Sequence, residues 1–250
     1  MTENFNDWLT SRPIAHRGLH NHTQQIPENS LPAFAIAAER GYAIELDVQL
    51  LLDKEVAVFH DERLKRMCRK DVLLSAVSST DLHRYPLLDT PERIPLLREV
   101  LMLVNGRVPL FIEIKRQPKV SHANMIILNT LLAYKGPYAI MSFDPFILAW
   151  FAKNAPLIPR GQLSSDFKDI PMPGYAKFLL KRFAFNFLSR PDFIGYIEDD
   201  IPNKTVQRQR KKGKPVIAWT VSTVQKRERL TGHIDNYIFE HFEPETRIAG

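Results

Sequence analysis

The stretch AIELDV, at residues 43–48, alternates apolar and acidic side chains. In a β-strand with this pattern, Glu45 and Asp47 point to one face while the apolar residues point to the other. A second stretch, LFIEIK at residues 110–115, repeats the pattern and places Glu113 on the corresponding face. We therefore predict two strands whose apolar faces pack against helices and whose acidic faces point inward.

Strand-like runs alternate with helical patterns along nearly the whole chain. One run, 55–60, departs from the alternation, because only a few residues near Asp53 join it to the strand before it. A parallel crossover needs a dozen or more residues, so we predict an antiparallel hairpin there. The other strands are predicted at 14–16, 43–48, 110–115, 138–142, 159–163, 192–197, 215–220 and 236–239, separated by helices that include 30–40 and 175–188.

Eight strands that alternate with helices predict an α/β fold, a single (β/α)8 barrel of the TIM type over residues 1–250 with a hairpin excursion after its second strand. A doubly wound open sheet is the alternative. The chain has 250 residues, of which 44% are hydrophobic and 25% charged, as in an ordinary soluble enzyme. This length suits one barrel-sized domain.

Charge and cysteine content narrow the class of protein only modestly. The formal net charge is +6, so the surface attracts anions without choosing among phosphate, nucleic acid and membrane headgroups. Cys68 is the single cysteine, which excludes an intrachain disulfide. The N-terminal sequence MTENFNDWLTSRP lacks the apolar core of a secretory signal, and the longest apolar run, 146–152, is too short to span a bilayer. We expect a soluble, cytoplasmic protein.

In a barrel, active sites lie at the carboxyl ends of the strands. Glu45 and Asp47 would repel each other there and lose hydration, and the neighbouring strand adds Glu113 and Lys115. A divalent cation would relieve both costs, although each carboxylate taken singly also fits a structural ion pair. Carboxylate oxygens favour Mg²⁺, Ca²⁺ or Mn²⁺ over zinc.

The first strand ends in His16, Arg17 and Gly18, and the hairpin returns His60 to the same end. Histidine transfers protons near neutral pH, arginine matches phosphate geometry, and glycine lets the backbone approach a ligand. Two histidines with a metal and nearby cations would meet the needs of phosphodiester cleavage. Either histidine alone is more often structural, and the pattern names no substrate.

Seven segments, in this order, resemble the glycerophosphodiester phosphodiesterase family and together extend over nearly the whole chain. They are IAHRG (14–18), IPENSLPAF (26–34), IELDVQL (44–50), VFHD (58–61), IEIK (112–115), SFDP (142–145) and AWTV (218–221). The resemblance implies a TIM-type barrel. It also implies hydrolysis of glycerophosphodiesters to an alcohol and sn-glycerol 3-phosphate.

By motif match, the resemblance implies roles for ten side chains. Glu45, Asp47 and Glu113 would be the metal ligands, and His16 and His60 the general acid and base. The residues that would bind substrate or line the site are Arg17, Lys115, Glu28, Asn29 and Trp219.

Two departures put the leaving-group specificity in doubt. Ser222 follows the AWTV segment where the family commonly has Asn, and IFEHFEP (238–244) replaces the family's I-T-D-x-P, with Glu240 as the acidic residue. The sequence also leaves open which histidine is the acid, whether a cyclic phosphate forms, which metal is bound, and the oligomeric state.

Other functions are weighed against this one. The segment 175–190 mixes Phe and Leu with Lys and Arg, which suits either a lysophospholipase D-like enzyme at a membrane surface or an ordinary barrel helix. A non-catalytic barrel is opposed by the complete set of matched positions. The basic run RQRKKGK (208–214) is typical of a solvated helix end, so we expect a small-molecule substrate and no nucleic-acid partner.

Overall fold

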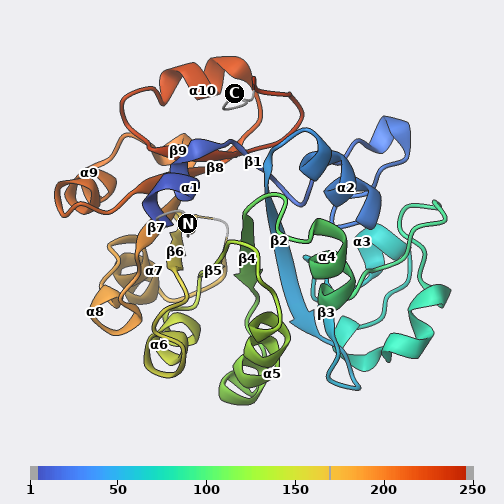
Figure 1. The fold of residues 1–250 in the computed structure, drawn as a ribbon. Helices are drawn as coiled ribbons and strands as arrows, with labels where there is room; N and C mark the ends of the chain where they lie inside the picture. Colours follow the sequence, from blue (N-terminus) through green and yellow to red (C-terminus); the bar gives the residue numbers. More distant parts are fainter. Residues whose placement is uncertain (1–4, 169, 246–250) are drawn as a thin grey trace. The chain divides into compact units, whose positions relative to one another are not determined.

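The computed structural model describes residues 5–168 and 170–245, and these form two compact units (Figure 1). We call residues 15–138 the N-terminal unit. We call residues 5–14 together with 139–245 the C-terminal unit. The prediction of a single domain over residues 1–250 stays a prediction.

The N-terminal unit starts at the end of β1 (Ile14–Ala15) and is built around three strands. β2 and β4 pair in parallel, with Asp47 opposite Glu113, as the shared alternation predicts. β2 and β3 pair antiparallel, with Val48 opposite Val58, so the predicted hairpin is confirmed. The elements are η1 (His22–Gln24), α2 (Leu31–Glu39), β2 (Ala43–Leu50), β3 (Val56–Val58), α3 (Lys65–Cys68), η2 (Leu74–Ala76), η3 (Ser79–Arg84), α4 (Leu97–Val104), β4 (Leu110–Ile114) and α5 (Val120–Leu132).

Helix α2 illustrates how local sequence sets the ends of an element. Ser30 is its N-cap, and the Ser30 hydroxyl accepts a hydrogen bond from the backbone N–H of Ala33. Gly41 follows the helix with a φ of +74°, a conformation that glycine adopts without a steric cost. The chain therefore turns directly from α2 into β2.

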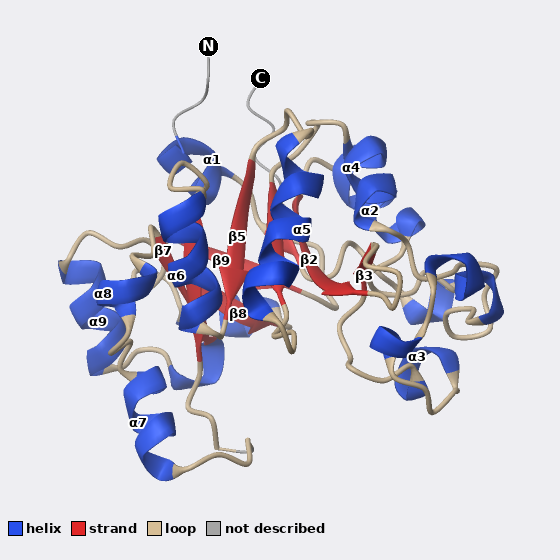
Figure 2. Ribbon diagram, turned by 90° about the horizontal axis from the view of Figure 1, so that it is seen from below, coloured by secondary structure: helices blue, strands red, loops and turns tan. Residues whose placement is uncertain are grey.

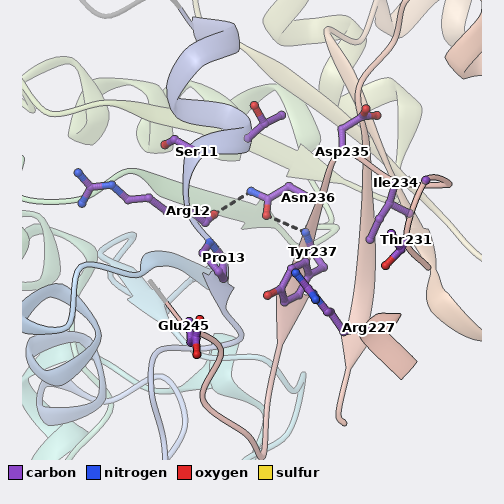
Figure 3. Close-up of a pocket in the computed structure, with 12 residues that line it drawn as sticks. Ser11, Arg12, Pro13, Arg227, Thr231, Ile234, Asp235, Asn236, Tyr237 and Glu245 are labelled. Carbon is purple, nitrogen blue, oxygen red and sulfur yellow. Dashed lines mark hydrogen bonds between the residues drawn. The ribbon is translucent and has the colours of Figure 1, made fainter. Parts of the chain in front are cut away.

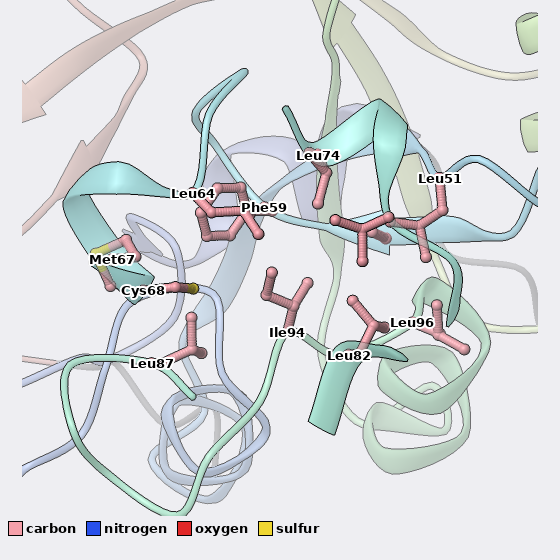
Figure 4. Close-up of a cluster of buried hydrophobic side chains, with 12 residues drawn as sticks. Leu51, Phe59, Leu64, Met67, Cys68, Leu74, Leu82, Leu87, Ile94 and Leu96 are labelled. Carbon is pink, nitrogen blue, oxygen red and sulfur yellow. The ribbon is translucent and has the colours of Figure 1, made fainter. Parts of the chain in front are cut away.

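The segment between β3 and α4 closes over its own hydrophobic cluster (Figure 4). Phe59, Met67 and Ile94 are almost completely buried in this cluster, together with Cys68. Each buried apolar side chain of this size stabilises the fold by about 1.5–3 kcal/mol. The cluster thus holds in place the loop after β3 and the helix α3, both of which carry site residues.

The C-terminal unit contains five parallel strands that pair in sequential order, β5-β6-β7-β8-β9, and all five are labelled in Figure 1. A doubly wound sheet reverses its strand order at a switch point, and this order does not reverse. The elements are α1 (Phe5–Ser11), β5 (Tyr138–Ser142), α6 (Pro145–Asn154), β6 (Arg160–Ser164), α7 (Gly174–Lys181), α8 (Asn186–Ser189), β7 (Phe193–Ile197), η4 (Glu198–Asp200), α9 (Lys204–Lys211), β8 (Val216–Val221), α10 (Val224–Arg229) and β9 (Asn236–Phe239).

The single helix predicted over 175–188 is wrong, because the structure breaks it into α7 and α8. Between them Phe183 has a φ of +56° and buries its ring against Tyr196, with ring centroids 5.9 Å apart. Burial of an aromatic ring outweighs the cost of a left-handed residue. The sequence pattern also missed α1 and α3.

Candidate active site

Three carboxylates meet on the inner face of the N-terminal unit. Glu45 and Asp47 come from β2 and Glu113 from β4, all three are buried, and one oxygen of each lies within 4.8 Å of the others. Burial, and then the charges of Asp47 and Glu113, raise the pKa of Glu45 well above its usual range. This concentration of buried negative charge, offered by hard oxygen donors, fits a divalent cation.

Lys115, the residue that follows β4, partly compensates this charge. Its Nζ lies 2.8 Å from Oδ1 of Asp47 and 2.6 Å from Oε1 of Glu113. Burial disfavours the charged form of Lys115, but these carboxylates outweigh it and raise its pKa. Burial likewise opposes ionisation of Asp47, while Lys115, His60 and Arg17 together hold its pKa below the usual range. Lys115 therefore stays positive beside the carboxylates.

Arg17 links β1 to the carboxylates through both backbone and side chain. Its backbone N–H donates to Oε2 of Glu45 at 3.0 Å, a contact made with a φ of +53°. Its Nη1 donates to Oε1 of Glu28 at 2.7 Å, and its Nε lies 3.3 Å from Oδ2 of Asp47. The carboxylates of Glu28 and Asp47 thus hold the Arg17 guanidinium in place through its Nη1 and Nε atoms.

Gly18 allows a close approach, but to a helix. Its φ is +81°, and a Cβ built there would lie 2.9 Å from the backbone carbon of Ala33 in α2. Gly18 therefore lets the turn after β1 pack against α2. The predicted close approach of a ligand to Gly18 stays a prediction.

The PEN segment (residues 27–29) supports the other site residues. Asn29 Nδ2 donates to Oδ2 of Asp47 at 2.9 Å, and the side-chain oxygen Oδ1 of Asn29 accepts from the Asp47 backbone N–H at 3.4 Å. Glu28 lies between Arg17 and Arg66, and these two arginines outweigh burial and lower its pKa to about 2. Direct contact of Glu28 or Asn29 with substrate stays a prediction.

His60 follows β3 and is oriented by its neighbour. Its Nδ1 lies 2.7 Å from Oδ1 of Asp61, and its side chain is 35% exposed. Burial, together with the charges of Lys115 and Arg17, lowers the pKa of His60 against the opposing effects of Asp47 and Asp61. Because a carboxylate accepts at Nδ1, the proton of the neutral ring belongs on Nδ1, and Nε2 is then the basic atom.

Arg66, from α3, connects the histidine to the PEN segment. Its Nε and Nη2 donate to the two oxygens of Asp61 at 2.7 and 3.1 Å. Its Nη1 and Nη2 donate to the two oxygens of Glu28, both at 2.7 Å. A continuous series of hydrogen bonds therefore runs from His60 through Asp61, Arg66 and Glu28 to Arg17.

Sequence reasoning missed Arg66 because a single arginine in a loop-like segment has no periodic signal. It also missed Gln49, whose Nε2 donates to the carbonyls of Phe59, His60 and Asp61 at 2.9, 3.1 and 2.9 Å. The alternation of β2 gives a signal that was available for Gln49, since it extends the inward face of Glu45 and Asp47 by one position.

The remaining predicted residues are His16 and Trp219. His16 follows β1 directly and is half-buried. Trp219 lies on β8 in the C-terminal unit, half-buried, with its ring edge-on to Phe143 at 5.3 Å between centroids. Among the described residues, its indole Nε1 is buried without a hydrogen-bond partner. Its contact with substrate stays a prediction.

The C-terminal unit also contains a cavity of about 440 Å³ at the start of β9 (Figure 3). Asn236 donates there to the carbonyls of Leu9 and Arg12, each at 2.8 Å, and so ties the segment before β1 to β9. None of the ten predicted site residues lines this cavity.

Comparisons with known proteins define first the fold and then the family. The chain matches a phosphodiesterase structure from Oleispira antarctica, in complex with the product sn-glycerol-3-phosphate, with a TM-score of 0.75 and 21% identity over 94% of each chain. It matches a glycerophosphodiester phosphodiesterase structure from Thermotoga maritima with a TM-score of 0.72 and 26% identity over 91% of this chain and 94% of that one. The predicted TIM-type (β/α)8 barrel is confirmed, with β3 as an additional strand.

Residues 16–238 match the Glycerophosphoryl diester phosphodiesterase family, and the chain belongs to this family of phosphodiesterases. A glycerophosphodiester phosphodiesterase from Caldanaerobacter subterraneus is 29% identical over 94% of this chain and 95% of its own length. One from Bacillus altitudinis is 31% identical over 65% of this chain and 73% of its own length.

Proposed function

We propose that the chain hydrolyses glycerophosphodiesters to an alcohol and sn-glycerol 3-phosphate, using a divalent cation at Glu45, Asp47 and Glu113. The observation that carries this proposal is the buried carboxylate cluster next to Lys115 and the oriented His60. A bound Mg²⁺, Ca²⁺ or Mn²⁺ supplies Lewis-acid stabilisation of charge on a phosphoryl oxygen. Membership of the family supports the choice of substrate class.

The chain's own side chains divide the remaining work. Arg17 and Lys115 attract the phosphate and stabilise the charge that develops on its oxygens. His60 Nε2 is the basic atom because Asp61 fixes the proton on Nδ1, so His60 deprotonates the attacking hydroxyl, whether of water or of the neighbouring glycerol hydroxyl. His16, which directly follows β1, protonates the leaving alkoxide.

Two substrates separate these histidine roles. His16→Ala and His60→Ala should both abolish turnover of glycerophosphocholine while substrate binding is largely kept. A glycerophosphodiester with a p-nitrophenol leaving group needs no acid, so it should restore turnover in His16→Ala but not in His60→Ala. His83→Ala is the matched control, because His83 is exposed and contacts only the carbonyl of Thr80 among its described hydrogen bonds. Near-full activity of either variant on glycerophosphocholine contradicts the assignment.

A metal-by-substrate matrix tests the metal and the leaving group together. EDTA should abolish activity, and Mg²⁺, Ca²⁺ and Mn²⁺ should each be tested for recovery against several glycerophosphodiesters and a lysophospholipid. Activity that survives EDTA treatment excludes the metal. A preference for the lysophospholipid favours the lysophospholipase D-like alternative.

A further inference from the structure

Helices α7 and α8 lie on the outer side of the C-terminal unit (Figures 1 and 2). Both helices carry large apolar side chains that are exposed. Tyr175 is 73% exposed and Phe187 is 71% exposed, and Phe178 and Leu188 are also exposed. No described residue of α7 is buried, whereas α5 of the N-terminal unit buries one complete face. An ordinary barrel helix buries its apolar stripe against the strands, whereas α7 contains no fully buried side chain.

The same segment carries only positive charge. Residues 170–190 contain four basic residues and no acidic one, which gives a charge of +4. The guanidinium of Arg182 lies 4.3 Å from the ring centroid of Phe178, so cation and aromatic ring are presented together. One of the four basic residues, Lys181, pairs with Asp200 from η4 at 2.8 Å. Arg182 and Arg190 are both exposed.

A small cavity of about 280 Å³ opens beside these side chains, between the end of α7 and the start of α9. Lys181, Arg182 and Lys204 line it together with Asn203. Arg182 and Lys204, together with Lys181 in its ion pair with Asp200, place positive charge around this cavity, which suits the phosphate of a lipid headgroup. The cavity adds an anion-attracting element at the edge of the aromatic surface.

We propose that this surface, which we call the aromatic–cationic patch, docks the protein on an anionic lipid bilayer. The patch consists of Tyr175, Phe178, Lys181, Arg182, Phe187, Leu188, Arg190 and Lys204. Aromatic side chains flanked by Lys and Arg are typical of helices that lie in the membrane interface. Complementarity to anionic headgroups favours a bilayer over a protein partner, because the segment offers no carboxylate to pair with basic side chains of a partner. In residues 5–168 and 170–245, every helix falls short of the length and hydrophobicity that a membrane span requires.

Vesicle sedimentation tests the proposal on the full chain. Wild type should bind vesicles containing about one-third phosphatidylserine, bind pure phosphatidylcholine weakly, and lose binding as salt rises. Arg182→Gln with Arg190→Gln should lower the partition coefficient about 25-fold, because each cation near an anionic surface contributes about fivefold. Tyr175→Ser with Phe187→Ser should lower it tenfold or more, since two apolar rings leave the interface.

Matched controls lie on other exposed surfaces. Leu157→Ser with Met102→Ser removes two apolar side chains that are 95% and 79% exposed, and Lys70→Gln with Lys135→Gln removes two exposed cations. All four pairs replace side chains that are mainly in water, so the fold should be kept, which circular dichroism checks. Control pairs should bind anionic vesicles like wild type.

Two results overturn the proposal. One is wild type that ignores anionic vesicles at low salt. The other is a dimer, seen by light scattering, that the aromatic variant abolishes while vesicle binding stays absent, because the patch would then be an interface between two copies. The proposal does not depend on the proposed catalytic roles, since vesicle binding is measured without substrate.

Discussion

Replacing Asp61 by Asn reverses the hydrogen-bond polarity at Nδ1 of His60. In the structure both Asp61 oxygens accept from Arg66, at 2.7 Å from Nε and 3.1 Å from Nη2. An Asn amide in this place has one donor–donor contact with Arg66 in either orientation. The longer of the two contacts, 3.1 Å to Nη2 instead of 2.7 Å to Nε, results when the amide oxygen faces Nε, and we expect that orientation. Its NH₂ group then faces Nδ1 of His60, which lies 2.7 Å from the present Oδ1.

An NH₂ group at Nδ1 makes this atom an acceptor and moves the ring proton to Nε2. His60 then cannot accept a proton from the attacking hydroxyl, and its protonated form loses the carboxylate that stabilises it. A wrong tautomer of this kind lowers kcat by about 10³- to 10⁴-fold, equivalent to roughly 4–5.5 kcal/mol in the barrier. We expect this loss in kcat for Asp61→Asn on glycerophosphocholine, with KM changed little.

The Arg66 contact supplies the decisive second variant. In Asp61→Asn with Arg66→Leu the amide is free to turn its oxygen towards His60, so kcat should recover at least tenfold relative to Asp61→Asn alone. Asp71→Asn is the matched control, because Asp71 accepts from Arg63 Nε at 2.6 Å on the exposed surface. The reasoning is refuted if Asp61→Asn keeps a third of wild-type kcat, or if the double variant is no better than the single one.

Three further predictions concern the stability of the protein. The pKa of Glu45 is raised, so the metal-free protein loses stability as the pH rises through that pKa. Glu45→Gln should therefore raise Tm in EDTA at pH 8, and should remove the increase in Tm that Mg²⁺ gives. A lower Tm of the variant in EDTA contradicts this. The pKa of Glu28 is lowered from 4.5 to about 2, so its contribution to stability is present above pH 4.5 and is lost as pH falls towards 2. In urea unfolding of the metal-free protein, acid should lower the free energy of unfolding by up to about 3 kcal/mol, and Glu28→Gln should lack this loss. An equal pH dependence in wild type and variant would exclude this contribution of Glu28. Ile94→Ala should cost about 2–5 kcal/mol by leaving a cavity in the cluster around it, and a cost below 1 kcal/mol in urea unfolding would show that the cluster collapses to fill the space.

Much of the fold and half of the candidate site follow from local pattern. Side chains alternate across a strand, so AIELDV and LFIEIK alone place Glu45, Asp47 and Glu113 on one face. The short connection before residue 55 excludes a parallel crossover and requires the hairpin that β2 and β3 form. These inferences need only covalent geometry and strand periodicity, both of which are local properties of the chain.

The tertiary structure decides which partner each side chain finds. Arg66 reaches Asp61 and Glu28 only because the cluster after β3 holds α3 in place. The predicted helix over 175–188 breaks at Phe183, because burying this ring against Tyr196 stabilises the fold more than continuing the helix would. A local sequence pattern does not contain this long-range contact.

The motif AIELDV at residues 43–48 shows the same contrast between what local sequence determines and what folding decides. Sequence by itself determined that Glu45 and Asp47 share an inward face, because a strand's geometry repeats every two residues. Only the tertiary structure decided that Asp47 is held ionised by Lys115 and Arg17 while Glu45 has its pKa raised. The reason is physical: ionisation of a buried carboxylate depends on distances to charges that lie far away along the chain, and these distances exist only after folding.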